Sequence, residues 1–504
     1  MNENECRPKL DGENITTLKE LIDRAAEQYE SRQAFMNCET VQDGMVSFHE
    51  LQKHVSTLAC AMEQHGYAEK HVAILGVNSY LWILSFFAIV YGGGVAVPLN
   101  WSLGVDELTE MVRVSDTALI LYSDAYEDNA VELKRRIPSL ELVPMHIIPE
   151  LLEKQWSRTA LDKVLEKKNR REELAAIVFT SGTTNYPKGV RLTNGNICAC
   201  VRGNCASVRI GGTSLLMLPL HHTLGLVVNL LSVFYWGYPS YINRSLKYLK
   251  RDFLEQQPNN LIVVPMILEM LQKSIVAVME SGEKIPEALL NLRVIICGGA
   301  PLREETIAFF EKMGIVVLNG YGTTECSPVI ATNRNDRVIP NSVGFPISCI
   351  QVRIAADGEI QVRGENVTSG YYNNEEATAS AFTEDGWYCT GDLGFLDEHG
   401  ALHILGRKNN LIVRSNGEKF FPEELENKIL KMPDVLQTVV FQENDTIVAE
   451  VYLDPNKTEA CERIRDDIRT LNLTIPISRN IGMIIIRDDP FQETALHKIH
   501  RDYR

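Results

Sequence analysis

The chain has 504 residues, 45% of them hydrophobic and 23% charged, which is ordinary for a folded protein with several domain-sized units. Its net charge of −16 disfavours a general nucleic-acid binder, because binding to a phosphate backbone requires an excess of Lys and Arg. The 11 cysteines form no CxxC pair and no Cys/His cluster of metal spacing, so we expect free thiols, no structural zinc and a cytoplasmic protein.

The beginning of the chain predicts neither a signal peptide nor a membrane span. Met1–Asn14 is polar and acidic, without the apolar core of a signal peptide. The most apolar stretch, Leu81–Val90, is about half as long as a bilayer-spanning helix. It runs into three glycines. We therefore expect a buried helix, a strand at Val95–Leu99, and no transmembrane segment.

Helical segments and continuous apolar runs then alternate. A helix is expected at Thr17–Tyr29, where Thr17 and Glu20 fit a capping box in front of an apolar stripe. The apolar runs are Val72–Leu75, Ala118–Tyr122, Ala175–Phe179, Leu261–Val264, Val294–Cys297 and Ile315–Leu318. Continuous apolar strands between helices predict an α/β fold whose parallel sheets are covered on both faces.

The character of the chain changes near residue 350. Ile350–Ile354 and Glu359–Arg363 alternate apolar and polar residues around Asp357-Gly358, which is the pattern of a β-hairpin. Further strands are expected near Leu402–Leu405, Leu411–Val413, Thr438–Phe441, Ile447–Tyr452 and Met483–Arg487, and helices near Pro422–Lys431 and Glu459–Leu471. A tail of about a hundred residues after Arg407 is long enough to fold as a small α+β unit.

The stretch Thr180–Val190 has the composition of a phosphate-binding loop. It contains four Ser or Thr hydroxyls, two glycines and Lys188. Hydroxyls and backbone N–H groups donate to phosphate oxygens, glycines allow a close approach, and lysine supplies charge. It is not a Walker A loop, because Pro187 precedes the lysine and Gly189 follows it. Taken alone, the stretch fits a polar surface loop about as well.

Other motifs follow in a fixed order. They are Asn319–Glu325, Trp387–Asp392, Gly406–Asn410, Asn416–Glu426 and Thr494–Arg501. In this order and spacing, the loop and these motifs resemble the adenylate-forming superfamily, which includes acyl- and aryl-CoA synthetases, peptide-synthetase adenylation domains and luciferases. The resemblance covers nearly the whole chain. The loop is moderately specific by itself, whereas the ordered set is highly specific.

The resemblance implies an AMP-forming acid–thiol ligase. Such an enzyme joins a carboxylic acid to the α-phosphate of ATP, releases pyrophosphate and passes the acyl group to a thiol. It implies ATP, Mg²⁺ and coenzyme A, or carrier-protein phosphopantetheine, and no nucleic-acid partner. It also implies an N-terminal ATP- and acid-binding domain at 1–407, with parallel-sheet subdomains and a small β-barrel-like part. A mobile lid at 408–504 would carry the catalytic lysine.

The resemblance also assigns the nucleotide-binding residues. The loop residues that would hold the β- and γ-phosphates are Thr180, Ser181, Gly182, Thr183, Thr184 and Lys188. Adenine would stack on Tyr321, within a site formed by Gly299, Ala300, Pro301, Asn319, Gly320, Gly322 and Thr323. Asp392 and Arg407 would bind the ribose.

The catalytic residues follow from the same resemblance. Thr324 would donate near the α-phosphate, and Glu325 would hold Mg²⁺, a hard cation that prefers oxygen ligands. Lys498 would bridge the attacking carboxylate and the α-phosphate, where negative charge concentrates. Gly417 would approach the path of the thiol in a second conformation of the lid.

The acid is expected to be hydrophobic. His222 fits a family position that borders the acyl pocket, and an apolar segment that we expect to be helical, Leu224–Phe234, follows it. No charged residue lies between Leu215 and Tyr238, which disfavours an amino acid, because its buried ammonium would be unpaired, and weakly disfavours a diacid. A fatty acid is the first expectation and an aromatic or other bulky apolar acid the second. The thiol belongs to coenzyme A or to a separate carrier protein, and the acidic net charge mildly favours coenzyme A.

Two positions depart from the family pattern. Asn185 and His497 stand where relatives commonly carry glycine. A catalytically silent nucleotide-binding protein is therefore an alternative. An adenylate-dependent oxygenase that resembles luciferase is another, although no specific residue supports it.

Overall fold

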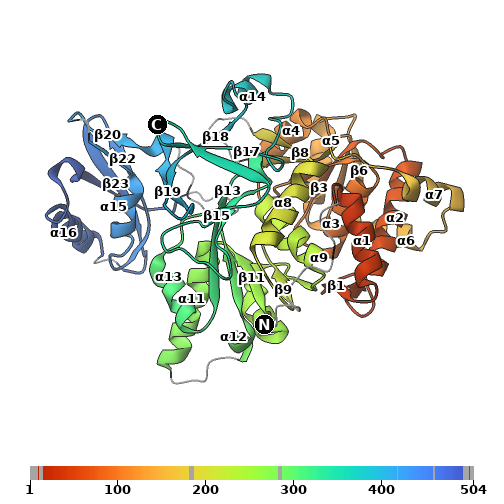
Figure 1. Cartoon of the computed structure of the whole chain (residues 1–504), viewed down its shortest axis with the longest axis horizontal. Coiled ribbons are helices and arrows are strands. Elements are labelled where there is room, and N and C mark those ends of the chain that lie inside the picture. Colours follow the sequence, from red (N-terminus) through yellow and green to blue (C-terminus); the bar gives the residue numbers. More distant parts are fainter. Residues whose placement is uncertain are drawn as a thin grey trace. The chain divides into compact units, whose positions relative to one another are not determined.

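The computed structural model describes residues 10, 15–180, 187–281, 287–416, 418–457, 460–491 and 499. The chain divides into two compact units (Figure 1). The first contains Met1–Val352, Val362–Tyr388 and Glu398–Leu402, and the second contains Arg353–Gln361, Cys389–Asp397 and His403–Arg504. Among the described residues, no helix combines the length and the apolar character that a bilayer span requires.

One six-stranded sheet of the first unit has five parallel strands and one antiparallel edge strand, β8. In spatial order its strands are β6 Glu141–Pro144, β5 Leu119–Tyr122, β3 His71–Leu75, β4 Val95–Leu99, β7 Leu174–Thr180 and β8 Lys188–Thr193. The helices of this part are α1 Leu18–Tyr29, α2 Phe48–Gln64, α3 Tyr80–Tyr91, α4 Val105–Val114, α5 Glu127–Arg136, α6 Ile148–Glu153 and α7 Arg158–Glu166. Leu108 and Leu133 of α4 and α5 share one buried core with Val97 and Ile120 of the sheet.

A nine-stranded sheet forms the other half of the first unit. Its order is β15 Phe345–Pro346, β14 Val329–Thr332, β13 Val316–Gly322, β12 Val294–Cys297, β11 Asn260–Val263, β9 Ser214–Leu216, β10 Ser240–Ile242, β1 Gln33–Met36 and β2 Met45–Ser47. The strands from β13 to β1 are parallel, and β2, β14 and β15 pair antiparallel with their neighbours. Its helices include α8 Asn194–Ser207, α9 Val233–Trp236, α10 Leu249–Gln256, α11 Pro265–Glu280, α12 Glu287–Asn291 and α13 Glu304–Lys312.

The remaining strands form smaller sheets. A four-stranded sheet has the order β16 Ile350–Ile354, β17 Glu359–Gly364, β18 Tyr388–Leu396 and β19 Leu402–Arg407. The second unit adds the hairpin β20 Ile412–Val413 with β21 Lys419–Phe420, and the sheet β22 Val435–Glu443, β23 Thr446–Leu453 and β24 Ile481–Arg487. Its helices are α15 Pro422–Ile429 and α16 Ala460–Asn472, and α14 Glu375–Ala381 belongs to the first unit. Ile429 and Ile468 pack with Val440 and Ala449 in the core of the second unit.

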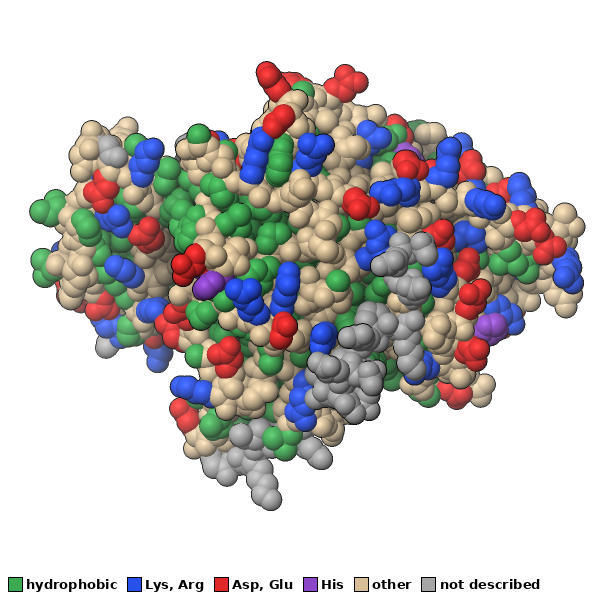
Figure 2. All heavy atoms as spheres, in the orientation of Figure 1, with side chains coloured by type: hydrophobic (Ala, Val, Ile, Leu, Met, Phe, Trp, Pro, Cys, Tyr) green, Lys and Arg blue, Asp and Glu red, His purple; other side chains and the backbone are tan. Residues whose placement is uncertain are grey.

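Most predicted elements are present. Thr17 caps α1, and its capping box with Glu20 is formed. The predicted apolar runs are buried strands of parallel sheets, so the α/β fold class is confirmed. The ten described cysteines are all free. On the face that Figure 2 shows, acidic and basic side chains are interspersed, so the net charge of −16 forms no field of a single sign there.

The predicted helix at Leu224–Phe234 differs in form from an α-helix. It is a π-helix over Leu224–Ser232 that continues into α9. Ser232 Oγ donates to Val227 O at 2.9 Å, and the fully buried Asn229 points its amide at backbone groups near β9. π-Helical turns are rare and occur often at functional sites.

Candidate active site

The candidate phosphate loop connects two antiparallel strands. Strand β7 ends at Thr180 and β8 begins at Lys188, and these two residues lie opposite each other. Ser181, Gly182, Thr183 and Thr184 of the predicted site lie outside the described residues. A Walker A loop leads into a helix. This loop leads into a strand, so a phosphate here would not face a helix N-terminus directly after the lysine.

Two predicted nucleotide motifs meet at one edge of the nine-stranded sheet. In the parallel pair β12–β13, Cys297 lies opposite Asn319. The turn at residues 298–301, which contains the predicted Gly299, Ala300 and Pro301, follows β12 at this point. A Cβ added to Gly298 would lie 3.5 Å from Gly320 O. The structure therefore brings together the two motifs that the sequence assigns to the adenine site.

Strand β13 carries the next predicted residues beyond the apolar run. Gly320 and Tyr321 pair with β14 as part of β13, and Thr323 follows the end of the strand. Gly322 has no room for a side chain, because a Cβ would lie 1.8 Å from Pro328 O. This close approach fixes the chain just before the turn that contains the candidate catalytic residues.

That turn is a short 3-10 helix, Thr324–Cys326. The Glu325 residue is only 8% exposed. Its Oε1 accepts a hydrogen bond from the Tyr371 hydroxyl at 2.8 Å. Burial, and then the nearby Glu325, raise the pKa of Tyr371 above its ordinary value, so the phenol remains a donor at physiological pH.

The loop at residues 217–223 carries the predicted His222 and is held by two buried asparagines. Asn78 donates to one carbonyl and accepts from one N–H of this loop at 2.9 and 3.2 Å. Asn229 accepts from two loop N–H groups at 3.2 and 3.4 Å and donates to Leu215 O at 3.1 Å. The π-helix and this loop are thus fixed to each other.

The first residue of the π-helix lies against the glycine turn. The Leu224 methyl carbons are 3.8 and 3.7 Å from the positions that Cβ atoms on Gly298 and Gly299 would occupy. The apolar segment that the sequence assigns to the acid therefore borders the turn that it assigns to adenine.

His221 and His222 lie together, with ring centroids 4.3 Å apart. Burial, and secondarily His222, lower the pKa of His221 well below its ordinary value. Its imidazole is therefore neutral at pH 7 and supplies no fixed positive charge for a second carboxylate of a bound acid.

Replacing Asn229 by alanine is expected to destabilise the first unit. The change leaves two buried N–H groups and one carbonyl without their present partners, at about 1–3 kcal/mol for each group that stays unsatisfied. Calorimetry should show a midpoint of thermal unfolding that is several degrees lower than that of the wild type. Asn456→Ala is the control, because Asn456 is exposed and bonds to nearby Asp454 rather than to a buried loop. Equal midpoints for the two variants would contradict this account of the loop.

In the second unit, the structure brings together the two predicted ribose residues. Asp392 Oδ1 is 3.0 Å from Arg407 Nε, and Arg407 Nη1 donates to Thr390 O at 3.2 Å. The side chain of Asp392 is 7% exposed and that of Arg407 is 54% exposed. The buried carboxylate thus pairs with a half-exposed guanidinium that also donates to Thr390 O. Gly417 and Lys498 lie outside the described residues.

Lys408, the residue after Arg407, is also held by carboxylates. Its Nζ lies 2.7 Å from Asp357 Oδ2 and 3.0 Å from Glu359 Oε2. The hydrogen bonds to these two residues raise the pKa of Lys408 above its ordinary value. These two contacts connect Lys408, the first residue of the predicted lid, to Glu359 of strand β17 and to Asp357 just before it.

Sequence reasoning missed the segment at residues 366–372. Within the first unit it joins strand β8 to the turn that contains Glu325. Tyr371 OH donates to Glu325, and Tyr372 N donates to Gly189 O at 2.8 Å. The only signal in the sequence is a glycine followed by two tyrosines, which has no charge or spacing typical of a catalytic motif.

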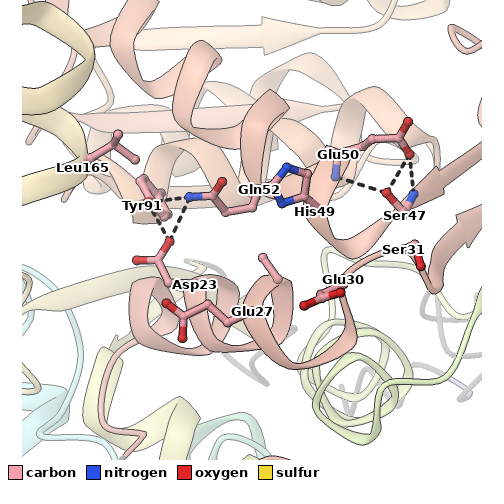
Figure 3. Close-up of a pocket in the computed structure, with 11 residues that line it drawn as sticks. Asp23, Glu27, Glu30, Ser31, Ser47, His49, Glu50, Gln52, Tyr91 and Leu165 are labelled. Carbon is pink, nitrogen blue, oxygen red and sulfur yellow. Dashed lines mark hydrogen bonds between the residues drawn. The ribbon is translucent and has the colours of Figure 1, made fainter. Parts of the chain in front are cut away.

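A separate groove of about 970 Å³ lies between α1 and α2 (Figure 3). It contains none of the predicted site residues. Asp23 accepts from Tyr91 OH at 2.7 Å and from Gln52 at 3.2 Å, and Glu50 forms a capping box with Ser47. These carboxylates stabilise the helices. In the part of the chain that is described, no three His, Cys, Asp or Glu side chains form a group suited to a metal ion.

A sequence model of the AMP-binding enzyme family matches residues 22–372, which is more than half of the chain. The chain belongs to this family. The matched region of this AMP-binding enzyme includes the phosphate loop, His222, Glu325 and the 366–372 segment, whereas Asp392 and Arg407 lie beyond it.

Relatives of this AMP-binding enzyme are named as CoA ligases. The long-chain-fatty-acid–CoA ligase FadD15 of Mycobacterium bovis is 29% identical over 449 residues, which cover 78% of this chain and 74% of the relative. A 2-succinylbenzoate–CoA ligase of Bacillus cereus is 30% identical over 422 residues, which cover 80% of this chain and 82% of the relative.

Solved structures share the fold over nearly the whole chain. ATP-bound MatB from Rhodopseudomonas palustris superposes with a TM-score of 0.81 at 23% identity, covering 96% of this chain and 97% of that one. The anthranilate CoA ligase AuaEII in complex with anthranoyl-AMP gives a TM-score of 0.80 at 19% identity, covering 96% and 95%. The predicted superfamily, fold class and enzyme class, an AMP-forming acid–thiol ligase, are confirmed.

Proposed function

We propose that this enzyme joins a hydrophobic carboxylic acid, with a fatty acid as the first candidate, to AMP and then transfers the acyl group to coenzyme A. The observation that carries the proposal is that the apolar Leu224 lies beside Gly298 and Gly299 of the 298–301 turn, which borders Gly320. Joining an apolar acid to a nucleotide requires an apolar wall beside the nucleotide site, so that the two reactants are held in contact. The names of the relatives support the same reaction type.

In the proposed first step, a carboxylate oxygen attacks the α-phosphorus of ATP and pyrophosphate leaves. Both reactants are anionic, so the chain must neutralise charge and fix geometry. Lys188 at the end of the phosphate loop and the Thr324 hydroxyl would serve the phosphates. Lys498 would bridge the carboxylate and the α-phosphate. In the second step the thiol attacks the acyl carbon and AMP leaves.

The surroundings of Glu325 fit a magnesium ion that arrives with ATP. Oε1 is occupied by the Tyr371 hydroxyl, and within the described residues Oε2 accepts no hydrogen bond. A buried carboxylate oxygen of this kind is a suitable ligand for a hard cation. Glu325 would hold the ion, and the bound ion would neutralise charge on the phosphates.

A straight-chain acid is favoured over a diacid by the charges near the loop at residues 217–223. Residues 215–238 contain no Lys or Arg, and His221 is neutral. A second carboxylate buried there would lack a charged partner. An aryl acid is the second candidate, because relatives and solved structures include a 2-succinylbenzoate and an anthranilate CoA ligase.

Acid-dependent pyrophosphate release tests the proposal. A panel of straight-chain fatty acids, benzoates, 2-succinylbenzoate and amino acids is compared at fixed Mg–ATP. For fatty acids, kcat/KM should rise by about fourfold per added CH₂ until the pocket is filled, since each buried CH₂ contributes about 0.8 kcal/mol. A preference for benzoates would support the aryl alternative. No release with any acid would refute the proposal and favour a silent nucleotide-binding protein.

The acceptor is tested with the preferred acid. Coenzyme A and a phosphopantetheinylated carrier protein are supplied separately at equal thiol concentration. We expect a thioester with coenzyme A. A thioester with the carrier protein alone would support the alternative ligase that loads a carrier.

A further inference from the structure

Glu325 and Tyr371 form a buried side-chain pair inside the first unit. The Tyr371 hydroxyl donates to Glu325 Oε1 at 2.8 Å, and the two residues are 9% and 8% exposed. A hydrogen bond between a phenol and a carboxylate that is shielded from water is stronger and better ordered than one at the surface. One oxygen of the carboxylate is therefore committed to the tyrosine.

The backbone around Glu325 is held by Asn366 and Thr368, which belong to the same 366–372 segment as Tyr371. Thr368 N donates to Glu325 O at 2.7 Å. The side chain of Asn366, which is fully buried, donates to Cys326 O and Val329 O at 2.8 Å each. The path of the turn thus depends on Thr368 and Asn366, which leaves the orientation of the carboxylate as the separate contribution of Tyr371.

Tyr371 also contacts the phosphate-loop strand. The Lys188 ammonium lies 5.5 Å from the centroid of the Tyr371 ring, within the range of a cation–π interaction. The buried phenol of Tyr388 lies near that of Tyr371, and burial, and then the nearby Glu325, raise the pKa of both. The proton of Tyr371 is directed to Glu325 by the bond that its hydroxyl donates.

We propose that Tyr371 is a positioning residue for the metal-bound nucleotide: by occupying Oε1 of Glu325, it leaves Oε2 for the magnesium ion of Mg–ATP. The inference rests on the proposed role of Glu325 in the reaction above. Tyr371 acts through Glu325 and Lys188.

Tyr371→Phe isolates the hydroxyl. The ring remains, so its contact with Lys188 is kept, while Glu325 Oε1 loses its donor and the carboxylate is free to rotate. Loss of a buried hydrogen bond to a charged group changes an equilibrium constant by about tenfold. The variant should lose nucleotide affinity only when the metal ion is present.

The experiment measures binding of α,β-methylene-ATP to the full chain without any acid, once with Mg²⁺ and once with EDTA. The ratio of the two dissociation constants is the metal gain. We expect a metal gain in the wild type and a metal gain about tenfold smaller in Tyr371→Phe. In EDTA the two proteins should have the same dissociation constant for α,β-methylene-ATP. With Mn²⁺ in place of Mg²⁺, paramagnetic resonance should show a matching loss of bound metal.

Tyr372→Phe is the matched control, because it is the same substitution one residue away. The Tyr372 hydroxyl donates to the exposed Asp116 at 3.1 Å. The Tyr372→Phe variant should therefore keep the wild-type metal gain. Tyr388→Phe is a second variant that retains the Tyr371 hydroxyl but removes the neighbouring polar hydroxyl, and it should show a smaller loss, about threefold. Thermal unfolding is recorded for all variants.

Three results would overturn the inference. The first is an unchanged metal gain in Tyr371→Phe or, if that variant does not fold, in Tyr388→Phe. The second is an equal loss of affinity with and without metal, which indicates a general structural role. The third is a wild type without metal gain. None depends on the acid. A wild type that has the metal gain but releases no pyrophosphate with any acid would instead refute the proposed function.

Discussion

Lys498→Ala is expected to lower acid-dependent pyrophosphate release by about 10²–10³-fold, the effect of removing one donor from a site of developing negative charge. The proposed role joins two anions, the attacking carboxylate and the α-phosphate, through one ammonium. No bond to phosphorus is made in the thiol step, so conversion of a supplied acyl-adenylate and coenzyme A to the thioester should continue at roughly the wild-type rate.

The two half-reactions are measured separately for this variant. Pyrophosphate release is recorded with saturating acid and ATP, and thioester formation with a synthetic acyl-adenylate. Lys457→Ala is the control, since Lys457 is an exposed lysine of the same unit. An equal loss in both half-reactions would mean that Lys498 supports the fold of the lid or the thiol site rather than adenylation.

Glu325→Gln should lower adenylation by about 10²-fold, because the charge that would bind the magnesium ion is lost while the volume is kept. The glutamine oxygen can still accept the hydrogen bond that Tyr371 donates at 2.8 Å, so the turn should persist. The main change should be a lower kcat/KM for Mg–ATP.

Initial rates are measured over a range of Mg²⁺ concentrations. The variant should require more Mg²⁺ for half-maximal rate, and thioester formation from acyl-adenylate should be spared. Glu304→Gln, an exposed change at the start of α13, serves as the control. A variant with the wild-type rate and Mg²⁺ requirement would remove Glu325 from the proposed metal site.

Local patterns predicted most of the fold. The apolar runs of β3, β4 and β7 are continuous because helices cover both faces of a parallel sheet, and α1 begins at Thr17 because its cap and Glu20 satisfy the first N–H groups. Such signals lie within a few neighbouring residues. The π-helical form of Leu224–Ser232 was not predictable, because Asn229 bonds to backbone groups 11 to 14 residues away.

The candidate site was predictable only where residue type suggests chemistry. Lysines, carboxylates and glycines in ordered motifs marked Lys188, Glu325 and Gly322. Tyr371 carries no charge, and its partner Glu325 is 46 residues away in the sequence. Asn78 is 140 residues from the loop carbonyl that it holds. Contacts of this kind arise from tertiary packing and leave no local pattern.

The most direct test of the account uses a fatty acid that carries ¹⁸O in its carboxylate, incubated with ATP, Mg²⁺, coenzyme A and the wild-type enzyme. If the acid attacks the α-phosphorus and the thiol then breaks the acyl carbon–oxygen bond, one ¹⁸O atom must appear in AMP for each acyl-CoA formed. Mass spectrometry of the products measures both. We expect singly labelled AMP in an amount equal to acyl-CoA. Unlabelled AMP, or ADP with ¹⁸O in inorganic phosphate, would contradict the account.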